Sequence, residues 1–211
     1  MDTIKINHSD EPIRLFKSDF LEFFTHISPV VVVILWLPVA GFFFIRGVCI
    51  KPQPLSAFFL PFGFLLGLFF WSLAEYLLHR FLFHYKPKTP QQEKIFYLFH
   101  GVHHEQPQCK TRLVMPPVVS IPLALVFYGL YHVLFGVLLQ APFMTAMVFS
   151  GFIIGYLIYD ITHYATHHWP MRSGILKALK RHHMRHHYKT PNQRFGVSSP
   201  LWDYIFGTRG D

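Results

Sequence analysis

The sequence predicts an all-α membrane protein, with four transmembrane helices and a cytosolic helical cap. Three observations support this prediction. Apolar residues make up 52% of the 211 residues and charged residues only 14%, whereas an average soluble domain has about 25% charged residues. The apolar residues, including most of the 24 phenylalanines, gather in long runs. Twelve of the 15 histidines fall in two segments that follow the second and fourth of these runs.

Four apolar runs are each close to the roughly 20 residues that a helix needs to cross the hydrocarbon of a bilayer. Prolines fall inside three of the runs, where a kink is tolerated if neighbouring groups satisfy the freed carbonyl oxygens. We predict transmembrane helices at residues 27–45, 55–78, 115–135 and 141–159.

The basic residues predict the orientation of these helices. Residues 79–112 contain six Lys and Arg and the segment after His163 contains eight, whereas residues 46–54 contain two and the turn GVLLQAP none. Because cytosolic loops are enriched in Lys and Arg, we expect both rich segments on the cytosolic face. Residues 1–26 are polar and mixed in charge, so we predict a short cytosolic tail there and one membrane domain over residues 27–211.

The histidines repeat one order in the two rich segments. A pair of histidines, in HRFLFH and then in HYATH, is followed each time by an HxxHH motif. Each HxxHH motif has the i, i+3, i+4 spacing of one helix face, whereas the first pair is five residues apart and shares a face only if its helix distorts. The pattern comprises ten histidines: His79, His84, His100, His103, His104, His163, His167, His183, His186 and His187.

This pattern predicts a dinuclear metal site. Neutral imidazole is the commonest metal-binding side chain and suits iron and zinc alike, and ten imidazoles are enough for two ions. The basic surroundings disfavour protonation and so keep the histidines in the form that binds metal. His168 and His182 interrupt the pattern, and we expect them to be neighbours of the ligands. The alternative is a pH-sensitive basic surface that meets anionic lipid.

Two carboxylates are candidates for orienting the ligands. Asp160 lies three residues before His163, and Glu75 lies four residues before His79. A metal-bound histidine usually donates its other N–H to a partner of this kind. Alternatively, Asp160 is a buried acid that pairs with an arginine. Tyr159 either lines the entrance to the site or belongs to an interfacial aromatic belt.

The order HxxxxH, HxxHH, HxxxH, HxxHH on four spans resembles the fatty acid hydroxylase superfamily of membrane di-iron enzymes. The segments YDITHYATHH and GVSSPLWDYIFGT resemble its fatty acid 2-hydroxylase branch, and the resemblance extends over about residues 15–208. It implies that the ten histidines bind the metal ions and that Tyr159 and Asp160 adjoin the active site. It also implies hydroxylation of C2 of an acyl chain, often within ceramide or dihydroceramide.

The resemblance further implies cofactors and partners. Two iron ions are expected for activity, and the expected substrates are O2 and a lipid from the bilayer. Zinc fits the ligands but has no redox chemistry, so zinc in a purified sample would be a substitution for iron. The HPGG haem motif of a fused cytochrome b5 domain is absent, so we expect a separate electron donor such as cytochrome b5 or a ferredoxin-type protein. No nucleic-acid partner is expected. The expected membrane is the endoplasmic reticulum in a eukaryote or the inner membrane in a bacterium.

Two other functions stay open at this point. A desaturase or hydroxylase of sterols or other lipids would use the same metal centre, and only the C-terminal segment favours the 2-hydroxylases. A zinc transporter or storage protein is the non-enzymatic alternative. Transporters usually place ionisable ligands near the middle of their spans, where this sequence has only His132.

Overall fold

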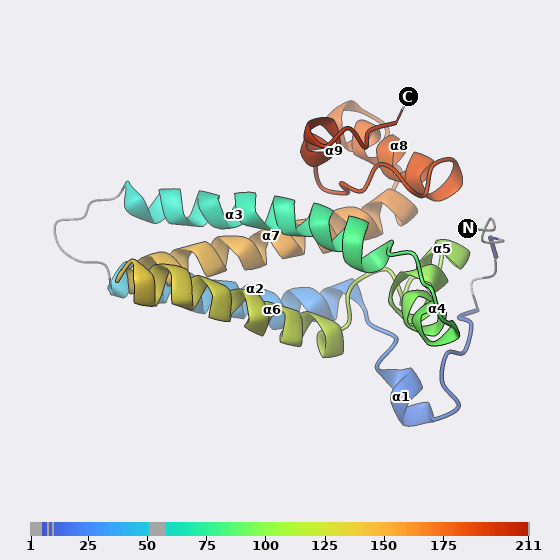
Figure 1. The fold of residues 1–211 in the computed structure, drawn as a ribbon, viewed down its shortest axis with the longest axis horizontal. Coiled ribbons are helices and arrows are strands. Elements are labelled where there is room, and N and C mark those ends of the chain that lie inside the picture. Colours follow the sequence, from blue (N-terminus) through green and yellow to red (C-terminus); the bar gives the residue numbers. More distant parts are fainter. Residues whose placement is uncertain (1–5, 8, 10, 51–57, 211) are drawn as a thin grey trace. The chain divides into compact units, whose positions relative to one another are not determined.

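The computed structural model describes residues 6–7, 9, 11–50 and 58–210, and all regular secondary structure in them is helical (Figure 1). The prediction of an all-α fold is confirmed. Three of the elements, η1 to η3, are π-helices that continue an α-helix. In order, the elements are α1 (Asp19–Phe23), α2 (Pro29–Cys49), α3 (Phe59–Leu77), η1 (Leu78–Phe83), α4 (Pro90–Phe96), η2 (Tyr97–Gly101), α5 (Val102–Glu105), α6 (Pro117–Tyr131), η3 (His132–Leu138), α7 (Pro142–His168), α8 (Gly174–Tyr188) and α9 (Leu201–Ile205).

Four of these helices are long and apolar enough to cross a membrane, as the sequence predicts. They extend over Pro29–Cys49, Phe59–Phe83, Pro117–Leu138 and Pro142–His168. The predicted beginning of the second span, at residues 55–57, lies outside the described residues. The fourth helix continues to His168 and so includes the first three histidines of the second segment, which the prediction placed after its end.

The chain divides into two compact units. One unit comprises Pro29–Leu73 and Met115–Ile158, and we call it the span unit. The other comprises Met1–Ser28, Ala74–Val114 and Tyr159–Asp211, and we call it the histidine unit. Helices α3 and α7 contribute residues to both units, so the two chain segments that carry the histidine pattern begin on membrane-length helices.

In the span unit, α7 contacts all three of the other long helices, which run alongside it in Figure 1. The apolar stretch of α7 is 83% buried, whereas the apolar stretches of the other three long helices are 22–33% buried. Helix α7 is therefore the central helix of the span unit. Glycine makes its closest contact possible: a Cβ atom on Gly151 would lie 1.9 Å from the carbonyl oxygen of Phe64 on α3. Small residues allow helix backbones to approach in this way within membranes.

In the histidine unit, the described N-terminal residues pack against the segment that follows α5. The backbone N–H of Ile27 donates to the carbonyl oxygen of Thr111 at 2.8 Å. The carboxylate of Glu22 pairs with the guanidinium of Arg112 at 2.5 Å. These residues therefore cover the segment that carries the first HxxHH motif. The division into a tail and one membrane domain stays a prediction.

Candidate metal centre

The structure brings the ten histidines of the pattern together in the histidine unit. They form two groups of five, each with its ligand nitrogens within 4.8 Å of one another, and each group could hold a metal ion. All ten side chains are buried. The first group is His79, His84, His100, His104 and His186, and the second is His103, His163, His167, His183 and His187.

The two HxxHH motifs exchange one residue between the groups. In the first motif, the rings at i and i+4 belong to the first group, but His103 at i+3 belongs to the second. In the second motif the reverse holds, and His186 at i+3 belongs to the first group. The ring of His104 stacks on that of His187, with centroids 4.2 Å apart, so the two groups are in direct contact. Two ions held there would form one dinuclear centre.

The distances between ring nitrogens in the second group test whether a metal ion fits. Consecutive Nε2 atoms lie 2.9–3.1 Å apart along the order His163, His103, His187, His183, His167. Nitrogens bound at about 2.1 Å and about 90° apart would be about 3.0 Å from each other, whereas tetrahedral ligands would be about 3.4 Å apart. The donor set therefore fits an ion with five or six ligands better than a tetrahedral one.

The first group has the same spacing. The Nε2 atom of His100 lies 3.1 Å from that of His79 and 3.0 Å from that of His104. The Nε2 atoms of His84 and His186 are 3.1 Å apart. Both groups therefore offer five nitrogens in a similar arrangement.

A π-helix explains how His79 and His84 enter one group although they are five residues apart. The backbone N–H of His84 donates to the carbonyl oxygen of His79 at 3.0 Å, which is the i→i+5 bond of a π-turn. The two rings then lie with centroids 4.9 Å apart. The distortion that the sequence analysis required for a shared face is present as η1.

Three of the ten imidazoles donate their outer N–H to a backbone carbonyl. Nδ1 of His79 bonds to the oxygen of Phe195 at 2.5 Å, and Nδ1 of His163 bonds to that of Leu113 at 2.9 Å. Nδ1 of His186 bonds likewise to the oxygen of Gln193, at 2.7 Å. A proton on Nδ1 leaves the lone pair of Nε2 free and turned toward the group, which is the form a metal ion requires.

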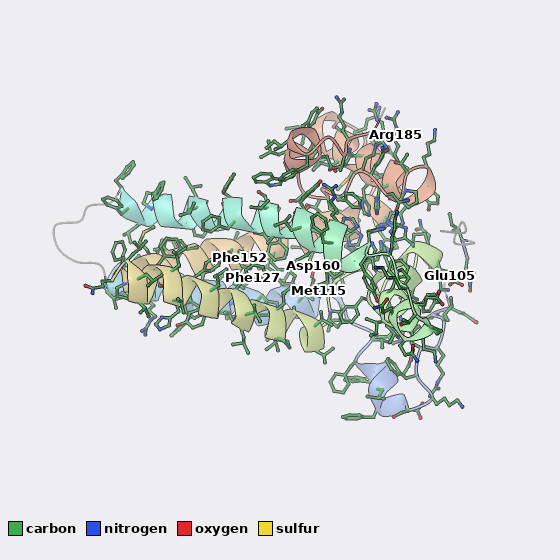
Figure 2. The ribbon with its side chains drawn as sticks, in the orientation of Figure 1. Glu105, Met115, Phe127, Phe152, Asp160 and Arg185 are labelled. Atoms are coloured by element: carbon green, nitrogen blue, oxygen red, sulfur yellow. The ribbon has the colours of Figure 1, made fainter. Side chains whose placement is uncertain are left out.

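The predicted role of Glu75 as the partner of His79 is wrong, whereas the role of Asp160 stays a prediction. Glu75 accepts from the backbone N–H groups of Val197 and Ser198, at 2.6 and 2.8 Å, and from the Ser198 hydroxyl; it does not accept from His79. The outer N–H groups of His79 and His163 donate to backbone carbonyl oxygens instead. Asp160, labelled in Figure 2, is buried on α7, but the Nδ1 atom of His167 has no partner among the described residues.

Tyr159 lies beside the second group. Its ring is buried and stacks on that of His163, with centroids 5.8 Å apart and planes 20° from parallel. The roles of Tyr159 and Asp160 in catalysis stay predictions.

Asp203 is the residue that sequence reasoning missed. It is fully buried, and its oxygens accept from the backbone N–H groups of Phe195 and Gly196 and from the hydroxyl of Thr208, at 2.7–2.9 Å. It thereby fixes the carbonyl of Phe195 that holds His79. Its other contact is Nε2 of His182 at 3.0 Å, so His182 lies outside both groups, as expected. A lone acid between the apolar residues of LWDYIF was the available signal.

Burial is the leading reason that these histidines stay neutral. It lowers the pKa of His104 to about 3, and the neighbouring imidazoles of His79 and His163 lower it further. The same two causes hold the pKa of His100, His103 and His183 well below the ordinary value. The sequence analysis attributed this effect to the basic surroundings, which contribute less than burial does.

Comparison with known proteins gives a consistent result. The sequence model described as "Fatty acid hydroxylase" matches residues 64–208. The chain is 36% identical over 198 residues to dihydroceramide fatty acyl 2-hydroxylase FAH1 of Arabidopsis thaliana, which covers 92% of this chain and 79% of that protein. It is 37% identical to fatty acid 2-hydroxylase of Homo sapiens, over 93% of this chain and 56% of that protein.

One solved structure is also similar. It is described as full-length scs7p with only the hydroxylase domain visible. It superposes with a TM-score of 0.80 at 37% identity, over 90% of this chain and 69% of that one.

Proposed function

Because this chain belongs to the fatty acid hydroxylase family, we propose that it inserts one oxygen atom from O2 at C2 of a fatty acyl chain. The proposed substrate is the N-acyl chain of ceramide or dihydroceramide; the name of the similar plant protein specifies dihydroceramide. The observation that carries the proposal is the pair of adjoining groups of five buried histidines.

The proposed ligands are the ten Nε2-bearing rings of the two groups. Iron is the proposed metal, because zinc sites are almost always tetrahedral and zinc has no redox chemistry. When bound, two iron ions supply the oxidising power that an unactivated C–H bond requires and that no side chain can supply.

The residues of the chain orient the centre and keep water out. Carbonyl oxygens of Phe195, Leu113 and Gln193 hold three of the rings by their Nδ1–H groups. Asp203 and Glu75 bind the segment 195–198 through its backbone N–H groups, so that it cannot move away from His79. We further propose that Tyr159 and Asp160 adjoin the reacting carbon, because Tyr159 covers the ring of His163.

The location and the electron donor are part of the proposal. We place the histidine unit on the cytosolic face, since the positively charged segments that carry the histidines are expected there. The membrane is the endoplasmic reticulum in a eukaryote and the inner membrane in a bacterium. Electrons come from a separate carrier, cytochrome b5 or a ferredoxin-type protein.

Lipid mass spectrometry tests this function. The chain and its His163→Ala variant are expressed in a host that makes ceramides and provides an electron donor. We expect the N-acyl chains to gain one oxygen in the strain with the unchanged chain but not in the strain with His163→Ala. Fragmentation should place this oxygen at C2. The matched control is His132→Gln, which alters an exposed histidine outside both groups and should keep the product.

The results separate the competing functions. Loss of two hydrogens, without added oxygen, would identify a desaturase with the same centre. An added oxygen at another carbon or on a sterol would contradict the proposed substrate. A third outcome is that the lipids are unchanged in all strains although the purified protein holds two ions. If adding cytochrome b5 or ferredoxin also yields no product, this outcome would count against an enzyme of this class.

A further inference from the structure

A second cluster of basic side chains lies in the histidine unit, outside the two histidine groups. It lines a cavity of about 530 Å³ between α8 and the C-terminal residues. Four arginines and one histidine contribute to this lining, and its described residues include no carboxylate. They are Arg181, Arg185, Arg194, Arg209 and His182.

Three of the four arginines have no acidic partner among the described residues. Arg181, Arg185 and Arg209 form no ion pair with any acid of the described chain. Asp203 contacts the ring of His182, but Asp203 is fully buried and does not line the cavity. Cations that gather in this way attract an anion to the cavity.

The fold holds these arginines in place. Arg181 and Arg185, the latter labelled in Figure 2, are four residues apart and share one face of α8. Arg194 is 3% exposed, and its Nη1 atom donates to the hydroxyl of Thr190 at 2.5 Å. A Cβ atom on Gly210 would lie 2.6 Å from that Nη1 atom, so Gly210 lies directly beside the guanidinium.

The fourth arginine is held by an aromatic ring. The guanidinium of Arg209 lies 4.4 Å from the ring centroid of Tyr204, a cation–π contact. One arginine of the cavity is therefore buried and one is supported by an aromatic ring, whereas Arg181 and Arg185 are exposed on α8.

Apolar side chains complete the lining. Ile175 and Tyr204 line the same cavity and are 79% and 55% exposed. Ile205 and Phe206 follow Tyr204 and are also exposed. A ligand that fits must therefore combine a strongly anionic group with an apolar part or an apolar neighbourhood.

We propose that this cavity binds the phosphate group of an anionic ligand. Guanidinium groups match phosphate oxygens in pairs, and basic pockets of membrane proteins bind phosphorylated lipid headgroups. The exposed apolar side chains favour a membrane phospholipid over a free phosphate compound. A volume of this size suits a headgroup better than it suits the broad surface of an acidic protein. The proposal does not depend on the reaction at the histidine groups.

Binding to the purified, metal-loaded protein in a neutral detergent tests the proposal. The probes are dioctanoyl phosphatidylinositol 4-phosphate, its headgroup inositol 1,4-bisphosphate, and dioctanoylglycerol as the uncharged tail. We expect the phosphorylated probes to bind, and the affinity to fall by about tenfold or more in Arg181→Gln/Arg185→Gln, which removes two charge-assisted contacts. The matched control is Lys177→Gln/Lys189→Gln, which removes two charges from exposed positions of α8 and its C-cap outside the cavity and should change the affinity less than about twofold.

Each arm of the experiment decides one point. Tighter binding of the lipid than of its headgroup identifies a lipid site, and equal binding identifies a site for soluble phosphate compounds. The proposal is overturned if dioctanoylglycerol binds as well as the phosphorylated lipid, if both double variants lose affinity equally, or if only an acidic polypeptide such as polyglutamate binds. If the double variant does not fold, Arg209→Gln, at an exposed side chain, repeats the measurement.

Discussion

At the scale of the residue, the helical position of a histidine does not decide which group it joins. His103 and His104 are neighbours in the sequence but belong to different groups, and the same holds for His186 and His187. The centre therefore depends on each ring separately. His103 is one of three rings in its group whose Nε2 atom contacts two others, in this case those of His163 and His187.

We predict that His103→Ala lowers the metal content from two ions per chain to one. The variant removes a central nitrogen of the second group and leaves all five nitrogens of the first. Metal analysis of purified protein by mass spectrometry measures the result, with His132→Gln as the control that should retain two ions. Retention of two ions by His103→Ala would contradict the assignment of this ring as a ligand.

Asp203 gives a prediction about the dependence of stability on pH. Burial alone raises the pKa of its carboxyl, but the bonds from His182, Thr208, Gly196 and Phe195 lower it below the ordinary value overall. A carboxylate with a lowered pKa stabilises the folded state at a pH above its unfolded pKa of about 3.9, and this contribution is lost as the pH falls through the folded pKa.

We therefore expect Asp203→Asn to melt at a lower temperature than the unchanged protein at pH 7, at a cost of about 2 kcal/mol in the free energy of unfolding. The difference between the two proteins should shrink as the pH falls below about 4. Both proteins are measured free of metal, so that loss of metal at low pH does not enter the difference. A difference that is constant from pH 7 to pH 3 would contradict this account.

At the scale of the element, the sequence predicts the long helices well and their distortions poorly. The apolar runs locate all four spans because length and composition are local properties. The π-helix that brings His79 close to His84 depends on a backbone hydrogen bond between residues five apart. No residue type in HRFLFH specifies this bond. The spacing of five residues was the only sign that a distortion was needed.

The partners of the histidines could not be predicted for a similar reason. Residue type is visible in a sequence, so the acids Glu75 and Asp160 drew attention as acceptors. The actual acceptors for His79, His163 and His186 are backbone carbonyls, which every residue has. Only the path of the loops around residues 113 and 193–195 decides which carbonyls reach the rings.

The contact between α3 and α7 yields a prediction for Gly151. A Cβ atom there would lie 1.9 Å from the carbonyl oxygen of Phe64, so the two helices must separate to admit it. We expect Gly151→Ala to destabilise the protein by about 1–3 kcal/mol, as overpacking does. Gly129→Ala is the matched control, because a Cβ atom at Gly129 meets nothing within 4 Å. Melting temperatures in detergent measure both, and equal values would show that the helices do not pack this closely.

At the scale of the whole molecule, ten neutral imidazoles are buried in one compact unit, and this arrangement is costly without a ligand. Five of them have an Nδ1 atom that is buried and has no partner among the described residues: His84, His103, His167, His183 and His187. Burying an unpaired polar group costs about 1–3 kcal/mol. Metal binding would offset this cost, because an ion that binds only the folded chain stabilises it by mass action.

We predict that removing the metal with a chelator lowers the melting temperature by several degrees and abolishes hydroxylation. Iron should restore both properties, whereas zinc should restore the melting temperature alone, because zinc fills the same nitrogens without redox chemistry. His103→Ala should show a smaller shift on chelation, since it has one ion to lose. If zinc restored activity, the proposed role of iron would be wrong; if chelation removed both ions without changing the melting temperature, the histidine unit would be stable without them.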